Sequence, residues 1–283
     1  MNSRFTTLIS AAELQALRAS PTAPVIVDTR FDLADVQAGR QAWREGHLPG
    51  SVYLHLDDDL SGPKTGTNGR HPLPGRSAFA ELLGRIGVTP ATQVVALDAQ
   101  GGVYAARVWW MLRWIGHADA AVLDGGVAAW VRAGGALVAD ETALGAVAPY
   151  PERAALTTQL DATDLARRLG RMRVLDARAP ERFRGEIEPL DAVAGHIPGA
   201  LNRFHRNNLD ADGRFKPVSQ LRAEFEALLG VEDAPALVHQ CGSGVTACHN
   251  LLAMEHAGLV GSALYPGSWS EWSSDPARPI ARG

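Results

Sequence analysis

A long internal repeat constrains the fold of this sequence more than any other feature. Three short landmarks occur in the same order in both halves of the 283-residue chain, and equivalent landmarks lie slightly more than half of the chain length apart. A repeat of this length indicates duplicated domains, because solenoid proteins repeat over much shorter periods. The paired landmarks are residues 27–30 with 175–178, 46–50 with 195–199, and 123–130 with 265–272.

Within each copy, short runs of Val, Leu and Ile alternate with helical patterns. Such runs are typical of buried parallel strands that crossover helices connect. The alternation predicts an α/β fold in each half, with a parallel sheet flanked by helices. Ser10 and Glu13 predict a capping box for a helix that reaches Arg18. The expected strands cover residues 25–27, 94–97, 121–123, 174–175, 236–238 and 263–265.

The repeat and the composition between its copies predict two domains. Residues 1–145 form the expected first domain and residues 159–283 the second. Residues 146–158 between them contain two prolines without clear periodicity, which is typical of a linker. Residues 56–75 are rich in Gly and Pro, and we expect a long structured loop there.

Charge and composition exclude several classes of partner. A net charge of -4 and a pI near 6.1 give no electrostatic footprint for nucleic acid. The sequence contains no run of 18 apolar residues, the length needed to span a membrane. Its N-terminus lacks the pattern of a signal peptide. With only two cysteines, a disulfide framework is not expected. We therefore expect small-molecule or protein partners, with no nucleic acid and no membrane, and we expect the protein to be cytoplasmic and monomeric.

Cys241 has the surroundings of a reactive thiol. It lies between an apolar run and a helical pattern, and Gly242 and Gly244 follow it. Glycines allow a tight turn that directs several N–H groups to one point, and the helix N-terminus adds partial positive charge. A thiol held there ionises easily, so we expect a solvent-facing thiolate. Free cysteines are often buried and inert, which is the role we expect for Cys248 on the helix.

The two copies differ at this loop. A gap-free alignment of residues 244–247 on residues 102–105 places Ala99 opposite Cys241. Only the second copy then carries a nucleophile. We therefore expect the first domain to serve as the wall of a cleft over Cys241.

Other readings of Cys241 are weaker. Cys241, Cys248 and His249 lack the four-ligand spacing of structural zinc sites. A Cys-based phosphatase would need an arginine six positions after the cysteine, where the chain has Ala247. A thiol protease or acyltransferase would need a histidine base. His239 is two residues away on the same strand, which leaves that role open, although a core role is favoured.

Together these motifs resemble the tandem-domain rhodanese family, and residues 241–247 are most similar to its 3-mercaptopyruvate sulfurtransferase branch. The likeness covers nearly the whole chain, including both Asp-x-Arg strands, both Gly-His-x-Pro-Gly turns and residues 108–110. It implies two rhodanese-like domains, the second catalytic. It also implies that the Cys241 thiolate takes sulfane sulfur from 3-mercaptopyruvate or thiosulfate, becomes a persulfide, and passes the sulfur to cyanide or a thiol. No metal or organic cofactor is implied.

The resemblance also assigns roles to individual residues. It implies that Ser243 polarises or deprotonates the donor, with Asp57 of the first domain contributing across the cleft. For Ser243, a loop residue that bonds its own backbone is an equal alternative. Arg182 matches the family arginine that binds the donor's anionic group, a task suited to a planar guanidinium, and Arg184 is the nearby alternative. The remaining expected substrate-binding residues are Gly242, Gly244, Val245, Thr246 and His71, although His71 has a turn role as its alternative.

Two departures bear on the donor. Thiosulfate-preferring relatives usually carry cationic side chains immediately after the cysteine, whereas Gly242 and Ser243 stand here, which favours 3-mercaptopyruvate. That branch usually has a second substrate-binding arginine where this chain has Leu190. Weaker 3-mercaptopyruvate binding, replacement by Arg203 or Arg206, and a shift towards thiosulfate all stay open. A non-catalytic persulfide carrier or sensor for a protein partner is the alternative function.

Overall fold

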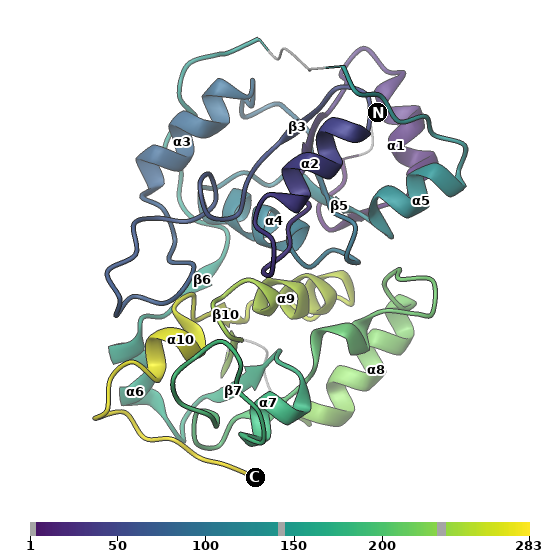
Figure 1. Cartoon of the computed structure of the whole chain (residues 1–283). Coiled ribbons are helices and arrows are strands. Elements are labelled where there is room, and N and C mark those ends of the chain that lie inside the picture. The colour runs from purple at the N-terminus through teal and green to yellow at the C-terminus, as the bar shows by residue number, and fades with distance from the viewer. Residues whose placement is uncertain (1–3, 141–144, 231–235) are drawn as a thin grey trace. The chain divides into compact units, whose positions relative to one another are not determined.

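The chain forms two compact units, each built around one parallel sheet (Figure 1). The computed structural model describes residues 4–140, 145–230 and 236–283. Part of the predicted long loop, Gly62–Leu73, groups with the second unit, and Ala211–Phe215 groups with the first. The first unit otherwise comprises Met1–Ser61 and Pro74–Leu156, and the second Thr157–Asp210 and Lys216–Gly283.

The first unit contains a five-stranded sheet of order β1-β5-β4-β2-β3, in which all pairs are parallel. Its central strands β2, β4 and β5 are entirely buried. Ser10 forms the predicted capping box with Glu13 at the start of α1. The elements are β1 Leu8–Ile9, α1 Ala11–Arg18, β2 Val25–Asp28, α2 Ala38–Glu45, β3 Ser51–Tyr53, α3 Arg76–Arg85, β4 Val94–Leu97, α4 Ala105–Trp114, β5 Ala120–Leu123 and α5 Gly126–Arg132.

The second unit repeats this topology with the order β6-β10-β9-β7-β8, again entirely parallel. Tyr265, Trp269 and Trp272 pack with the strands in its core. The elements are β6 Thr158–Gln159, α6 Ala162–Arg168, β7 Arg173–Asp176, α7 Pro180–Arg184, β8 Leu201–Asn202, the 3-10 helix η1 His205–Asn208, α8 Val218–Leu229, β9 Leu237–Gln240, α9 Thr246–His256, β10 Ala263–Leu264 and α10 Ser268–Trp272.

The repeat extends to buried ion pairs at the ends of β2 and β7. Arg30 binds Asp28 at 2.8 Å, and Arg178 binds Asp176 at 2.7 Å. Each arginine also donates to the carbonyl of the glycine that opens the Gly-His-x-Pro-Gly turn. Each pair therefore satisfies its own buried charges and fixes the turn to the strand end.

The predicted α/β class is confirmed in both halves. All six expected strands form, most with bounds shifted by one or two residues. The sequence did not indicate the short strands β1, β3, β6 and β8, which have two or three residues each and lack a long apolar run. Within the described residues, no helix combines the length and the apolar character needed to cross a membrane.

Candidate active site

The loop of residues 241–245 connects β9 to α9 at the carboxyl edge of the second sheet. Ligands of open α/β sheets bind at this edge. Gly244 has a φ of +75°, and a side chain there would collide with the carbonyl oxygen of Pro266. Glycine is therefore required for the turn that carries Cys241 into α9.

Cys241 is held through its backbone. Its N–H donates to Ser268 Oγ at 3.0 Å, and its carbonyl accepts from the Trp269 N–H at 2.9 Å. The residue is 1% exposed, so the expectation of a solvent-facing sulfur is wrong. The start of α10 is bonded to both backbone groups of Cys241 and packs against the loop, an arrangement that the local sequence does not reveal.

The first unit places an aspartate where the second has its cysteine. In each unit the last residue of β2 or β7 pairs with the last residue of β4 or β9, and the next residues are Asp98 and Cys241. The Val127 N–H donates to the Asp98 carbonyl at 3.1 Å, just as Trp269 donates to Cys241. Asp98, and not Ala99, is therefore the counterpart of Cys241. The gap-free alignment failed because the first loop contains one additional residue.

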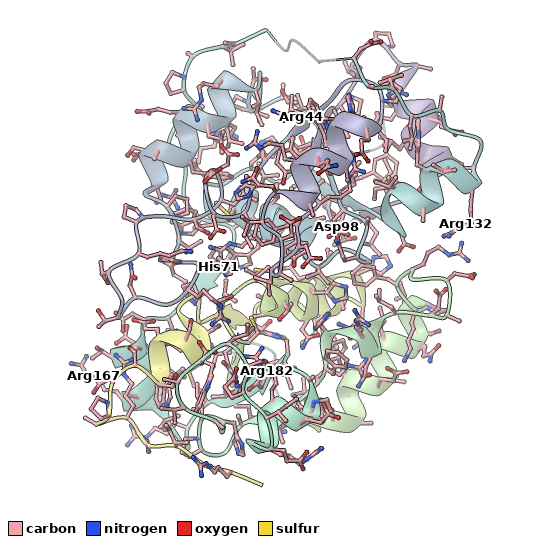
Figure 2. The ribbon with its side chains drawn as sticks, in the orientation of Figure 1. Arg44, His71, Asp98, Arg132, Arg167 and Arg182 are labelled. Atoms are coloured by element: carbon pink, nitrogen blue, oxygen red, sulfur yellow. The ribbon has the colours of Figure 1, made fainter. Side chains whose placement is uncertain are left out.

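The Asp98 carboxylate, which Figure 2 labels, shows which kind of group the backbone of this loop holds. It is fully buried and accepts four hydrogen bonds from the N–H groups of its own loop. Oδ1 accepts from Gln100 and Gly102, both at 2.9 Å, and Oδ2 accepts from Tyr104 at 2.8 Å and Ala105 at 3.1 Å. We call this ring of donors the amide cradle. In the first unit it holds an anion at the N-terminus of α4.

The second unit has the same turn with a thiol at that position. Gly244, like Gly102 with its φ of +94°, adopts a left-handed conformation before the helix. By this correspondence, the N–H groups of Gly244, Thr246 and Ala247 are counterparts of the last three donors around Asp98. A neutral thiol accepts hydrogen bonds weakly, whereas a sulfur anion accepts them well. The arrangement is suited to holding negative charge on sulfur.

Ser243 and His71 lie together in the second unit, although 172 positions separate them in the chain. Ser243 Oγ and His71 Nδ1 are 2.8 Å apart, and both residues are buried. His71 comes from the segment Gly62–Leu73, which belongs to this unit. A hydroxyl hydrogen-bonded to an imidazole can relay a proton, so the pair is equipped for acid–base work next to Cys241.

Asp57 belongs to the first unit. It lies in the turn that follows β3, is partly buried, and donates its N–H to His55 Nδ1 at 3.2 Å. Its expected contribution to the reaction stays a prediction.

Arg182 lies at the loop, and two carboxylates hold it there (Figure 2). Its Nη2 is 2.6 Å from Glu188 Oε1 and 3.3 Å from Asp191 Oδ2, and its Nε is 3.2 Å from Glu188 Oε2. A β-carbon at Gly242 would lie 3.4 Å from Arg182 Nη1. This guanidinium is therefore adjacent to the residue that follows Cys241.

The other arginines that the sequence suggested as substrate-binding residues lie in different surroundings. Arg184 is 41% exposed at its side chain and pairs with Glu186 at 2.6 Å. Arg203 is tied to Glu224 at 2.6 Å, and Arg206 is exposed on η1. Of the arginines considered from the sequence, Arg182 alone contacts the loop among the described residues.

Two residues weighed from the sequence belong to the core. His239 pairs through Nε2 with Ser262 Oγ at 3.1 Å, and burial lowers the pKa of His239 to about 3. It is neutral at pH 7 and part of the packed strand β9. Cys248 is fully buried in α9, where its thiol donates to the Gly244 carbonyl at 3.3 Å, in agreement with the predicted packing role.

Sequence reasoning missed several side chains around the loop. For Ser268 a signal existed, because the repeat places it opposite Gly126, whose φ is +55°. The second copy has a serine where the first has a glycine in a left-handed conformation, and a non-glycine residue at such a position indicates a special role for its side chain. No local pattern indicated the others, which are Arg70, Glu188, Asp191 and Ser270.

Ser268 combines an unfavourable backbone with a useful hydroxyl. Its φ is +53°, and its Oγ accepts from the Cys241 N–H while donating to the Tyr265 carbonyl at 2.9 Å. Both Ser268→Ala and Ser268→Gly lose these bonds, but only glycine relieves the left-handed strain. We expect the alanine variant to be less stable than the glycine variant by about 1 kcal/mol in urea unfolding. The usual order, with alanine more stable, would contradict this account.

Comparison with known proteins agrees with the repeat. The family model described as "Rhodanese-like domain" matches residues 10–133 and again 161–275. A Pseudomonas aeruginosa protein named "Probable 3-mercaptopyruvate sulfurtransferase" is 46% identical over 282 residues, which cover 98% of each chain. The chicken thiosulfate sulfurtransferase is 32% identical over 259 residues, covering 87% of this chain and 85% of the relative.

A solved structure supports the same relationship. The 3-mercaptopyruvate sulfurtransferase from Leishmania major matches with a TM-score of 0.84 and 29% identity, covering 95% of this chain and 74% of the other. Two matches to one family model, together with 46% identity to a curated relative over nearly the full length of both chains, identify the family. The chain belongs to the rhodanese-like family, of which it contains two tandem copies.

Proposed function

We propose that this protein is a sulfurtransferase. Cys241 takes sulfane sulfur from 3-mercaptopyruvate or thiosulfate and passes it to a thiophilic acceptor such as cyanide or a thiol. The observation that carries the proposal is the amide cradle, which holds the Asp98 carboxylate in the first unit, together with the position of Cys241, which is the counterpart of Asp98 in the second. The names of the relatives provide independent support.

In the first half-reaction the Cys241 thiolate attacks the sulfur of 3-mercaptopyruvate. An S–S bond forms and the C–S bond breaks, and the electron pair of that bond leaves with carbon as the enolate of pyruvate. Protonation of the enolate carbon gives pyruvate. Cys241 then carries a persulfide anion, whose charge the cradle stabilises as it would stabilise the thiolate.

In the second half-reaction the acceptor attacks the outer sulfur of the persulfide. With cyanide, a C–S bond forms and the S–S bond breaks, and its electron pair returns to Cys241 as the thiolate. Thiocyanate is released and the enzyme is restored. The sulfur moves without any net change in the oxidation state of the protein.

Ser243 and His71 supply the proton transfers of the first half-reaction. The donor arrives as a thiol and leaves as an enolate, so a proton must be removed from sulfur and returned to carbon. The 2.8 Å contact between Ser243 Oγ and His71 Nδ1 provides a route for that proton. We further propose that Asp57 of the first domain assists this pair, as the family resemblance implies.

A product assay tests the function directly. With 3-mercaptopyruvate and cyanide, we expect the protein to release pyruvate and thiocyanate in equal amounts over many turnovers. Formation of a stable persulfide that cyanide does not discharge would instead favour the carrier or sensor alternative. Release of neither product, together with no persulfide from either donor, would contradict the proposal.

A further inference from the structure

His55 is buried where the chain leaves β3 at the carboxyl edge of the first sheet. Its Nε2 lies 2.9 Å from the Val36 carbonyl oxygen, and its Nδ1 lies 3.2 Å from the backbone nitrogens of both Asp57 and Asp58. Nε2 therefore carries the ring proton, and the lone pair of Nδ1 accepts the two N–H groups. Phe31 packs edge-to-face against the ring, with 5.1 Å between the centroids. The imidazole is thus fixed both in position and in tautomer.

These contacts make His55 the N-cap of the turn that residues 56–59 form. An N-cap side chain accepts the N–H groups of the residues that follow it, as Nδ1 does here. The N–H groups of Asp59 and Leu60 donate to the His55 carbonyl at 3.0 and 3.2 Å, and the His55 N–H donates to Asp59 Oδ2 at 2.8 Å. The bonding is reciprocal, as in a capping box. His55 therefore anchors the turn through its ring, its N–H and its carbonyl.

The turn carries three consecutive aspartates, so its register decides where each carboxylate points. Successive side chains of a helical turn point about 100° apart. The Asp58 carboxylate lies 3.4 Å from His55 Nδ1 and 3.8 Å from Arg40 Nη2, whereas Asp59 accepts the His55 N–H. A slip of one residue would put a neighbouring aspartate in the place of Asp57. The bonds to Nδ1 oppose this slip, because they select the N–H groups of two particular residues.

The second unit builds the corresponding turn without such a cap. The residue before each turn donates its N–H to the carbonyl of the last residue of β2 or β7, which makes Phe204 the counterpart of His55. Phe204 precedes η1, and within the described part of the chain its side chain makes no cap hydrogen bond. Residues 206–208 are Arg-Asn-Asn where the first unit has its aspartates. The shared fold therefore does not require a histidine here, and the imidazole cap occurs in the unit that carries the acidic turn.

We propose that His55 is a positioning residue, which holds Asp57 in the orientation from which it assists the Ser243–His71 pair. This inference rests on the proposed function and on the role proposed there for Asp57. His55 acts through the backbone of the turn and not on the reacting atoms. A catalytic group displaced by about 1 Å can cost about a hundredfold in rate. Loss of the cap therefore lowers kcat, whereas KM changes little.

Two substitutions each keep one half of the imidazole's hydrogen bonds. Asparagine places an acceptor oxygen near the position of Nδ1 and is a preferred N-cap residue, whereas glutamine places an N–H donor near Nε2 and loses the cap. We expect His55→Gln to lower kcat for 3-mercaptopyruvate about 10- to 100-fold with KM within about threefold of wild type. His55→Asn should keep both constants within about threefold of wild type. Steady-state pyruvate release measures both constants.

His117→Gln is the matched control for stability. His117 is also buried in the first unit, with its Nδ1 3.1 Å from Tyr150 Oη, and it precedes β5 at the opposite edge of the sheet. We expect this variant to unfold at a lower urea concentration than wild type and to keep its kcat. A loss of kcat as large as that of His55→Gln would assign the effect to destabilisation alone and overturn the proposal.

A double-mutant cycle with Asp57→Asn connects the effect of His55 to Asp57. If His55 acts through Asp57, the double variant with His55→Gln should have the same kcat as Asp57→Asn alone. Losses that multiply in the double variant, or a wild-type kcat in Asp57→Asn, would contradict the proposal. Equal kcat values in His55→Gln and His55→Asn would do the same.

Hydrogen exchange tests the cap without turnover. The amide hydrogens of Asp57 and Asp58 should exchange faster in His55→Gln than in wild type and keep their protection in His55→Asn. Unchanged protection in His55→Gln would overturn the proposal even in a protein without activity. Absence of sulfur transfer from the wild type, with the exchange pattern as expected, would instead contradict the proposed function.

Discussion

Replacing Cys241 with serine is expected to reduce sulfur transfer by at least about a thousandfold, because removal of a catalytic nucleophile has effects of this size or larger. Serine fits the same space and leaves the backbone bonds to Ser268 and Trp269 intact. Its oxygen cannot form a persulfide, and a hydroxyl does not ionise in the cradle at neutral pH. Steady-state assays with 3-mercaptopyruvate and cyanide measure the loss.

The matched control for this variant is Cys248→Ser. Cys248 is equally buried, and a serine hydroxyl can keep its bond to the Gly244 carbonyl. We expect this protein to retain most of its activity. Circular dichroism and urea unfolding should show Cys241→Ser folded, with stability within about 1 kcal/mol of wild type. Full activity in a folded Cys241→Ser protein would remove Cys241 from the reaction.

Asp98→Asn is expected to have the largest effect on stability. The Asp98 carboxylate accepts four buried N–H donors, and an amide would replace one acceptor oxygen with an NH2 group that faces two of them. Buried donors left without a partner each cost about 1–3 kcal/mol, so we expect the loss of two such bonds to lower the free energy of unfolding by about 2–6 kcal/mol. Urea unfolding followed by fluorescence measures this loss.

Asp35→Asn is the control for this substitution. Asp35 is exposed and its carboxylate accepts an N–H from Gln37 at 3.0 Å, so the change should remain within about 0.5 kcal/mol. If Asp98→Asn proved as neutral as Asp35→Asn, the cradle would not depend on an anion. Asp98 would then give no reason to expect a stabilised sulfur anion at Cys241.

The fold could be predicted because its determinants are local or repeated. The apolar runs of β2, β4 and β5 are continuous and buried, and the capping box at Ser10 is a short-range signal. Gly-rich turns at strand ends indicated the Cys241 loop in the same way. The repeat supplied what a single copy could not, namely that both halves share one topology.

The finer features of the site depend on contacts that sequence patterns do not encode. Arg70 reaches Gly242 only because a Gly- and Pro-rich segment docks on α10, and such docking has no periodicity. One additional residue in the first loop concealed the equivalence of Asp98 and Cys241. The burial of Cys241 likewise follows from the packing of α10. The placement of Arg70 and the burial of Cys241 both depend on tertiary contacts between segments distant in sequence.

The most direct test is the mass of the protein after reaction with 3-mercaptopyruvate in the absence of an acceptor. We predict a gain of one sulfur atom, located by peptide mapping on the peptide that contains Cys241, and its loss to cyanide with formation of an equal amount of thiocyanate. A protein that turns over without ever carrying sulfur on Cys241, or that carries it on Cys248, would contradict the account.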